Sequence, residues 1–192
     1  MASRNAEKIA SRSAWANSRG ISDTTSSSNN NDDSSNICTI IGAGRIGSLL
    51  AQGGGDATIL KRGDVLSDDN DDEESLIGTP IFIATRNDSL EPIVQSCPPH
   101  RKDDLVFLQN GYLDSFLQSK ECQDNTQALL YLSVPALGVE PVDGVTKVNP
   151  EGLTAVTGRH AQALADRLGN LGLKCRVVDG EEYRPAMFEK LM

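Results

Sequence analysis

The sequence predicts an α/β fold with a doubly wound, mostly parallel β-sheet. Apolar runs of strand length alternate with segments of helical spacing along the 192-residue chain, a pattern typical of a parallel sheet covered by helices on both faces. In addition, the glycine-rich segment 42–47 directly follows the apolar run 37–41. A G-x-G-x-x-G match is specific only when it lies between a strand and the start of a helix, as it does here. The segment therefore predicts a dinucleotide-binding Rossmann unit.

The glycine-rich segment supplies the first candidates for cofactor contact. They are Gly42, Ala43, Gly44, Arg45, Ile46 and Gly47. The first glycine permits a tight turn, the second lets the backbone approach a pyrophosphate, and the third lets the helix pack close to the strand. The N–H groups and the dipole of the helix N-terminus favour phosphate. The alternative is a glycine turn without a ligand, and the strands before and after the motif argue against it.

The remaining elements follow from apolar runs and from the glycines and prolines that interrupt them. Strands are predicted at 57–60, 80–85, 105–108, 128–134 and 175–178, and helices from Ile46 to the glycines at 53–55 and at 89–95, 113–117, 160–171 and 181–192. Glycines between β-branched residues predict a hairpin at 139–158. In the last helix Pro185 suits the first turn, and Met187, Phe188 and Leu191 are expected to share one face.

The first 36 residues contain little apolar surface to bury. Residues 24–35 are entirely Ser, Thr, Asn and Asp, so we expect a disordered tail. The basic, acid-poor residues 1–20 suit an organellar transit segment and equally a cytosolic tail, and nothing suggests secretion. The predicted organisation is therefore a tail at 1–36, a Rossmann NAD(P)-binding domain at 37–180, and at 181–192 the start of a C-terminal helical domain whose remainder is missing.

Composition excludes several classes of function. A net charge of -9 argues against a nucleic-acid surface or a polybasic membrane anchor, and no apolar run approaches the ~20 residues of a membrane span. The four cysteines are scattered and predict separate reduced thiols. The acidic run at 64–74 lacks the glycine and the final glutamate of a calcium loop, so no metal site is expected. The expected partner is a small-molecule substrate, with a homodimer left open.

The end of the second strand bears on the type of cofactor. NAD-type sites place a carboxylate there for the ribose 2′-hydroxyl, whereas this chain has Lys61 and Arg62, two cations suited to a 2′-phosphate. We therefore predict NADP. Asp64 follows closely and keeps NAD use open.

Two further strand ends belong to the same predicted sheet edge. Thr85 and Arg86 follow the strand at 80–85, and Arg86 suits a cofactor phosphate or ribose. Asn110 follows the strand at 105–108, where its amide could bond a nicotinamide or a substrate. The alternatives are a solvated arginine and a plain Asn-Gly turn.

The order of these motifs resembles that of a known family. The chain has six short motifs in the same order as the N-terminal domain of the ketopantoate reductases. They are GAGRIG, KR, ATRN, LQNG, a GR before a helix, and YRPAMFEKL. The resemblance covers 37–192 and implies reduction of a 2-keto acid with NADPH. It also implies that Arg62 binds the 2′-phosphate, that Asn110 lies beside nicotinamide and substrate, and that Lys190 is the general acid.

Several departures indicate a diverged relative of plant or algal type. Arg86 stands where the family usually has lysine, and Phe188 where it has tryptophan. We expect an NADP-dependent oxidoreductase acting on a 2-keto acid or related carbonyl, with Lys190 and Asn110 as catalytic residues. Two alternatives are a non-catalytic dinucleotide-binding regulator or scaffold, and an acidic interaction protein. We expect poor turnover by the 192-residue chain, because the wall that would face the cofactor sheet and shield the keto acid from water is missing. In addition, Lys190 is near the end of a helix that should fray.

Overall fold

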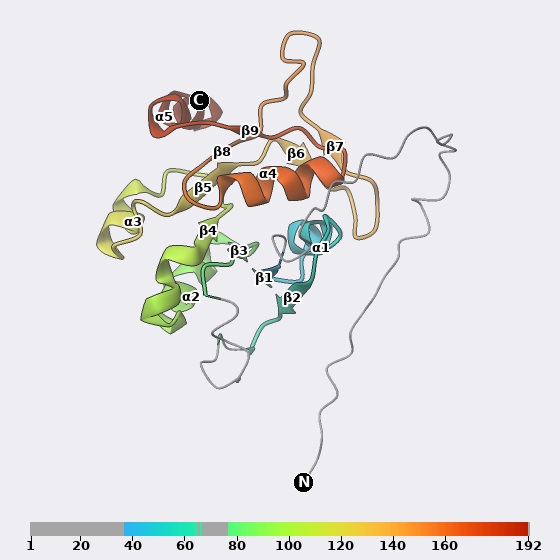
Figure 1. Cartoon of the computed structure of the whole chain (residues 1–192). Coiled ribbons are helices and arrows are strands. Elements are labelled where there is room, and N and C mark those ends of the chain that lie inside the picture. Colours follow the sequence, from blue (N-terminus) through green and yellow to red (C-terminus); the bar gives the residue numbers. More distant parts are fainter. Residues whose placement is uncertain (1–36, 65, 67–76, 192) are drawn as a thin grey trace, which may run out of the picture. The chain divides into compact units, whose positions relative to one another are not determined.

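Short apolar strands build one seven-stranded sheet in the computed structural model, which describes residues 37–64, 66 and 77–191. The strands are β1 (Cys38–Ile41), β2 (Ala57–Leu60), β3 (Ile81–Ile83), β4 (Leu105–Phe107), β5 (Thr126–Leu129), β8 (Ala155–Thr157) and β9 (Arg176–Val177). Their order across the sheet is β2-β1-β3-β4-β5-β8-β9 (Figure 1). Strands β1 to β5 are parallel, and β8 and β9 run against them. The predicted mostly parallel α/β sheet is therefore confirmed.

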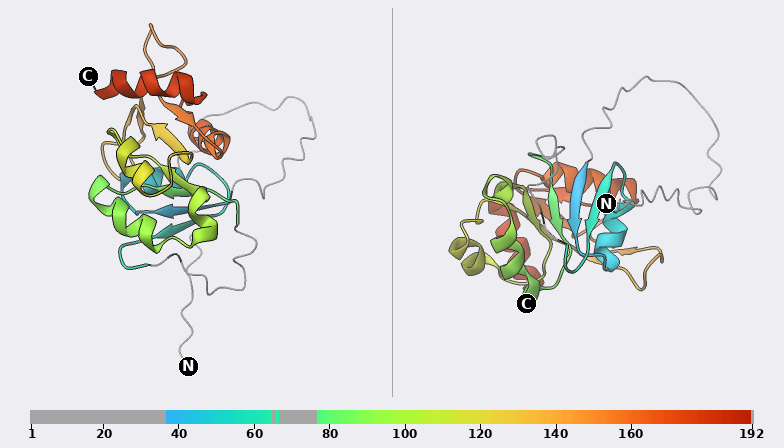
Figure 2. Two further views of the ribbon diagram at one scale, coloured as in Figure 1. Left: turned by 90° about the vertical axis from the view of Figure 1, so that its left-hand side faces the viewer. Right: turned by 90° about the horizontal axis from the view of Figure 1, so that it is seen from below.

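Helices lie on both faces of this sheet (Figure 2). They are α1 (Arg45–Ala51), α2 (Leu90–Ser96), α3 (Asp114–Ser119), α4 (Ala161–Asn170) and α5 (Gly180–Leu191), with 3-10 turns at Asn87–Ser89 and Pro99–Asp104. Because neighbouring strand residues face opposite sides, Phe82 packs in the core under α1 and α4, whereas Ile81 and Ile83 pack in the core under α2 and α3. The doubly wound arrangement follows from this double burial.

Two predictions for residues 128–158 are wrong. The apolar run at 128–134 is not one strand, because β5 ends at Leu129 and the Tyr131 N–H donates to Thr154 Oγ1 at 2.9 Å. Beyond this bend β6 (Leu132–Ser133) pairs with β7 (Val142–Asp143) in a separate two-stranded sheet. Residues 139–158 therefore form no hairpin, because β7 and β8 belong to different sheets. Apolar periodicity cannot indicate where a chain leaves a sheet.

The last helix also differs in detail from the prediction. Helix α5 begins at Gly180, where the Glu182 N–H donates to Asp179 Oδ1 at 2.9 Å, so Pro185 lies in its second turn. Its buried residues are Tyr183 and Met187, which pack on Leu129. Phe188 and Leu191 are about half exposed, at 47% and 48%, so of the three residues predicted to share one face only Met187 is buried.

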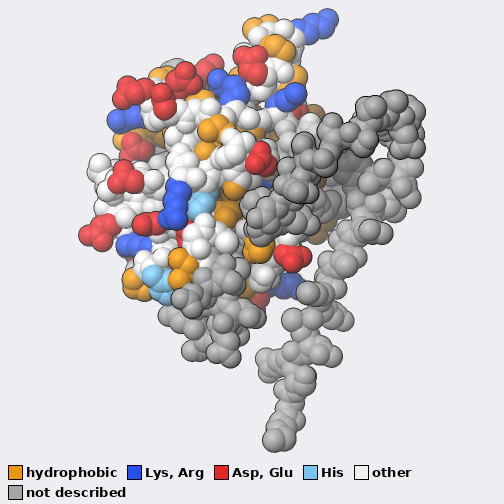
Figure 3. Space-filling model, in the orientation of Figure 1, with side chains coloured by type: hydrophobic (Ala, Val, Ile, Leu, Met, Phe, Trp, Pro, Cys, Tyr) orange, Lys and Arg blue, Asp and Glu red, His pale blue; other side chains and the backbone are white. Residues whose placement is uncertain are grey.

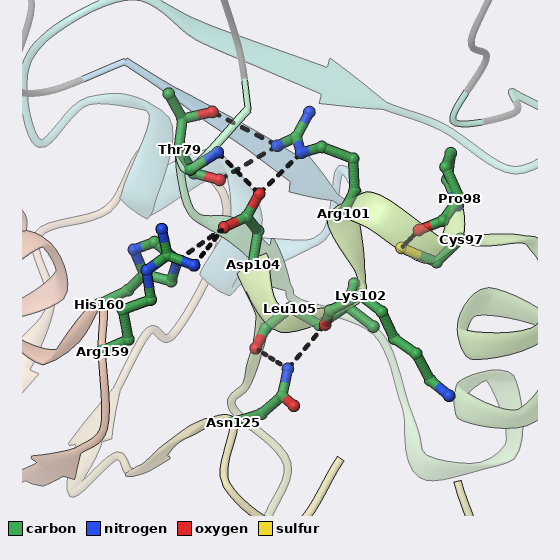
Figure 4. A network of polar contacts seen from close by, with 11 residues as sticks. Thr79, Cys97, Pro98, Arg101, Lys102, Asp104, Leu105, Asn125, Arg159 and His160 are labelled. Carbon is green, nitrogen blue, oxygen red and sulfur yellow. Dashed lines mark hydrogen bonds and ion pairs between the residues drawn. The ribbon is translucent and has the colours of Figure 1, made fainter. Parts of the chain in front are cut away.

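A buried polar network ties together the amino-terminal edge of the sheet, where β3, β4 and β5 begin (Figure 4). The Asp104 carboxylate accepts hydrogen bonds from Arg101 Nε at 2.8 Å and from the Gly78 N–H at 3.0 Å. Its other oxygen lies 3.1 Å from His160 Nε2. Asp104 and His160 are 2% and 6% exposed. These hydrogen bonds stabilise the amino-terminal edge of the sheet. The ligand site predicted from the sequence lies at the opposite edge, where the parallel strands end.

This network predicts a dependence of stability on pH. Burial lowers the pKa of His160 from 6.5, and this effect exceeds the opposing effects of Asp104. The unfolded chain therefore binds the proton more tightly, and the free energy of unfolding should fall as the pH drops below about 6.5, by at most ~1.4 kcal/mol per pH unit. Denaturant melts at pH 7.5 and 5.5 measure this. His160→Gln keeps an amide donor for Asp104 without titrating, so an unchanged pH dependence in that variant would refute the assignment.

The surface of the described residues agrees with the acidic composition. Acidic side chains gather over α5 in the space-filling view (Figure 3). The projecting loop after β7 carries apolar side chains beside charged ones (Figure 3), and Val148 in this loop is 86% exposed. All four cysteines are free, as predicted. Among the helices that the structure describes, none has the length and apolarity needed to cross a bilayer. The predictions for the tail at 1–36 and for the acidic segment 67–76 concern residues outside the described part.

Candidate functional site

The carboxyl ends of β1 and β3 form the point where the strand order reverses. From β1 the chain continues into β2 on one side, and it then crosses to β3 on the other side. Ligands of doubly wound folds bind in the crevice outside such a switch point. Here the glycine turn follows β1, residues 84–87 follow β3, and residues 108–111 follow β4. All three connections leave the same edge of the sheet, since these strands are parallel.

Each glycine of the motif has a separate physical role. Gly42 has φ +112, and a Cβ there would lie 2.8 Å from Ala84 O. A Cβ on Gly47 would lie 1.8 Å from Gly42 O, so the helix can pack onto the turn only with glycine there. In contrast, a Cβ on Gly44 would meet nothing within 4 Å, and its φ of -75 suits any residue. Folding therefore requires Gly42 and Gly47, while Gly44 leaves open space at the start of α1.

A cleft of about 520 Å³ opens at this edge of the sheet. Its lining residues are Arg45, Ile46, Ile83, Ala84, Thr85, Arg86, Asn87, Leu108, Gln109 and Asn110. Five of the candidates named from the sequence are thus brought together from the start of α1 and from the loops after β3 and β4: Arg45, Ile46, Thr85, Arg86 and Asn110. The other candidates (Gly42, Ala43, Gly44, Gly47, Lys61, Arg62 and Lys190) do not line it.

The charged side chains that line the cleft are two arginines. Arg45 donates from one guanidinium nitrogen to Val134 O at 2.9 Å and Pro135 O at 3.3 Å, and it forms no ion pair with a carboxylate in the part of the chain that the structure describes. Arg86 forms an exposed ion pair with Asp88 at 3.2 Å. The wall of the cleft is therefore cationic, although the chain as a whole is acidic. Such a cleft suits an anionic ligand.

Lys61 and Arg62 lie beside the glycine turn rather than in the cleft. The Gly42 N–H donates to Leu60 O at 2.9 Å, which places the end of β2 next to the turn. Both cations are exposed, and neither makes an ion pair within the described part of the chain. Asp64 folds back, and its carboxylate accepts the Lys61 N–H at 2.7 Å. Asp64 is the carboxylate on which the predicted alternative of NAD binding depends, and one of its two oxygens thus already accepts a hydrogen bond.

Lys190 is held firmly, which corrects the expectation of a fraying end. Its Nζ donates to Leu130 O at 2.7 Å and lies 4.4 Å from the centre of the Tyr131 ring. Burial lowers its pKa to about 8. Leu130 directly follows β5, whose carboxyl end shares the edge of the cleft because β5 is parallel to β4.

Aromatic stacking connects Lys190 with the Asn110 loop. The Tyr112 ring stacks on Phe188 with centroids 6.1 Å apart. Tyr112 lies two residues beyond Asn110, and Phe188 lies two residues before Lys190. This contact joins α5 to the loop that follows β4, and that loop also carries Asn110.

Gln109 is a residue of the site that the sequence prediction did not select. Its side chain is 7% exposed, and its Nε2 donates to Ile83 O at 2.8 Å and Thr85 O at 3.2 Å. It therefore clamps the end of β3 to the end of β4. A glutamine directly after a buried strand was the available signal, but local sequence does not show which of the two side chains, Gln109 or Asn110, turns inward.

Structural comparison finds this fold in reductases and dehydrogenases. A dimeric ketopantoate reductase from Staphylococcus aureus matches with a TM-score of 0.50 and 18% identity, over 81% of this chain and 58% of its own. A D-mandelate dehydrogenase, solved with NADH and anilino(oxo)acetate, matches with a TM-score of 0.50 and 18% identity, over 80% of this chain and 60% of its own. The chain has the fold of these proteins. No family model and no curated protein matches the sequence.

These matches confirm at the level of the fold the resemblance that the motif order indicates. This chain spans about 58 to 60% of the length of the two structures. At 18% identity, this likeness shows the fold alone.

Proposed function

We propose that the protein is an NADP-dependent oxidoreductase of the ketopantoate reductase type that reduces a 2-keto acid or a related carbonyl. The observation that carries this proposal is the glycine turn at the switch point, with open space at Gly44 beside a cationic cleft. In this proposal residues 37–180 form the dinucleotide-binding domain.

The residues present fit a dinucleotide. Gly44 leaves room for a pyrophosphate at the start of α1, where no side chain caps the helix. Lys61 and Arg62 are free for a 2′-phosphate at the end of β2. Arg45 and Arg86 add charge near the pyrophosphate. When bound, NADPH would supply the hydride for reduction of the carbonyl.

Lys190 and Asn110 would act on the substrate. Asn110 would bond the carbonyl group and hold it in place. Lys190, with a pKa of about 8, keeps a proton at neutral pH and gives it up more readily than an ordinary lysine, as a general acid requires. Its ammonium would protonate the oxygen of the carbonyl as that oxygen becomes an alkoxide.

Cofactor preference tests the proposal. The 192-residue chain should bind NADPH more tightly than NADH, because two cations stand at the end of β2 and one oxygen of the nearby Asp64 carboxylate already accepts the Lys61 N–H. One charge-assisted contact contributes about 1.5–3 kcal/mol, so Arg62→Ala should weaken NADPH binding by roughly tenfold or more and leave NADH binding nearly unchanged. Fluorescence titration of both cofactors measures this.

The outcomes separate the alternatives. Equal affinity for both cofactors, or a preference for NADH, would overturn the role of Arg62. Failure to bind either cofactor would overturn the proposed function. Tight NADPH binding without oxidation by any member of a 2-keto acid panel would instead favour a non-catalytic regulator or scaffold. Sedimentation with and without NADPH, run on the same samples, tests whether the chain forms a homodimer.

A further inference from the structure

Two polar atoms in the cleft wall have no hydrogen-bond partner in the described part of the chain. They are Gln109 Oε1 and Thr85 Oγ1, and both are buried. Leaving a buried polar group without a partner costs about 1–3 kcal/mol, which makes such atoms informative. They come from residues that follow two neighbouring strands, β3 and β4, and both residues line the same cleft.

The orientation of the Gln109 amide is fixed by its surroundings. Its nitrogen donates to two carbonyl oxygens, Ile83 O and Thr85 O, which uses both N–H groups. The flipped amide would place its oxygen against those two acceptors. Oε1 is therefore a free acceptor turned away from β3, on a side chain that is 7% exposed.

Thr85 complements this acceptor. The Thr85 methyl carbon would lie 3.0 Å from a Cβ built on Gly42, so the methyl group faces the glycine turn. The hydroxyl on the same carbon is left to donate or accept. One fixed acceptor and one available donor together match a group that has both an N–H and a carbonyl oxygen, which is a carboxamide.

We propose that Thr85 and Gln109 form a subsite that binds the carboxamide of the nicotinamide ring, with Gln109 Oε1 accepting from the amide nitrogen and the Thr85 hydroxyl donating to the amide oxygen. This assignment rests on the proposed function. The positions agree with it, because the end of β2 takes the 2′-phosphate and the glycine turn takes the pyrophosphate. The other half of the dinucleotide is then left for the ends of β3 and β4.

Three ligands test the subsite by equilibrium binding, without any need for turnover. NADPH has the whole contact, its 3-acetylpyridine analogue lacks the amide N–H, and adenosine 2′,5′-bisphosphate lacks the nicotinamide half. Thr85→Val removes the hydroxyl and keeps the shape. It should weaken NADPH binding about 5- to 10-fold, as expected for one hydrogen bond, and change bisphosphate binding less than about twofold. Thr58→Val, at the exposed position of β2, is the matched control and should change neither.

Gln109→Met addresses the acceptor. The native chain should prefer NADPH over the acetylpyridine analogue by roughly fivefold or more, and this preference should disappear in Gln109→Met. Circular dichroism and bisphosphate binding show whether Gln109→Met is folded. If it is not folded, the binding data for Thr85→Val alone test the carboxamide subsite. Equal weakening of NADPH and bisphosphate by Thr85→Val, or no weakening, would overturn the subsite. Failure of the native chain to bind NADPH and bisphosphate would overturn the proposed function instead.

Discussion

Gly47→Ala should unfold the protein, whereas Gly44→Ala should leave it folded and impair cofactor binding. A Cβ at position 47 would lie 1.8 Å from Gly42 O, a backbone atom that cannot move without opening the turn. Gly47 is buried on the face of α1 that packs on the sheet. Separating α1 from the sheet should lower the free energy of unfolding by more than about 4 kcal/mol.

Gly44→Ala is the matched control for this change. The same methyl group at position 44 meets nothing within 4 Å, and the backbone there suits alanine. The loss of a glycine at the N-cap costs about 1 kcal/mol. If the open space receives the pyrophosphate, the methyl group should weaken NADPH binding about tenfold or more. Denaturant melts and fluorescence titrations measure the two effects, and equal stability of the two variants would contradict the assignment of the glycines.

Much of this site could be predicted because glycine motifs and strand ends are local features. The roles of Gly42 and Gly47 depend on a turn encoded within six residues, and parallel strands bring their carboxyl ends together without further information. Contacts between distant segments could not be predicted in the same way. The clamp of Gln109 on Ile83 O spans 26 residues, and the bond from Lys190 to Leu130 O spans 60.

The same distinction explains the error about Lys190. Sequence position indicates an exposed lysine on the last turn of a helix, and such a turn frays unless tertiary contacts hold it. The Tyr112–Phe188 stack and the buried pair of Tyr183 and Met187 provide those contacts. Neither contact follows from helical spacing, because each needs a partner from a distant loop or strand. The expectation of poor turnover thus loses one of its reasons and stays a prediction.

Lys190 should lose its proton near pH 8, compared with 10.5 for an ordinary lysine, because burial lowers its pKa. Competitive labelling with acetic anhydride across pH 6–11 measures this directly and needs no turnover. Exposed Lys147 is the internal reference for the labelling reaction. If the pKa of Lys190 is found near 10.5, its contacts with Leu130 O and Tyr131 do not form in solution.

Lys190→Met should then remove most carbonyl reduction, with Lys147→Met as the matched control. A general acid contributes about 10²–10⁴-fold, so kcat/KM for the best 2-keto acid should fall by at least about 100-fold in Lys190→Met and stay unchanged in Lys147→Met. The direction in which kcat/KM changes with pH follows from the protonation state that Lys190 needs. A general acid must carry its proton, so kcat/KM of the native chain should decline as the pH rises through about 8. NADPH oxidation at 340 nm follows both. Undiminished turnover by Lys190→Met, or a rate that rises through pH 8, would remove Lys190 from the mechanism and leave the proposed contact with the substrate to Asn110.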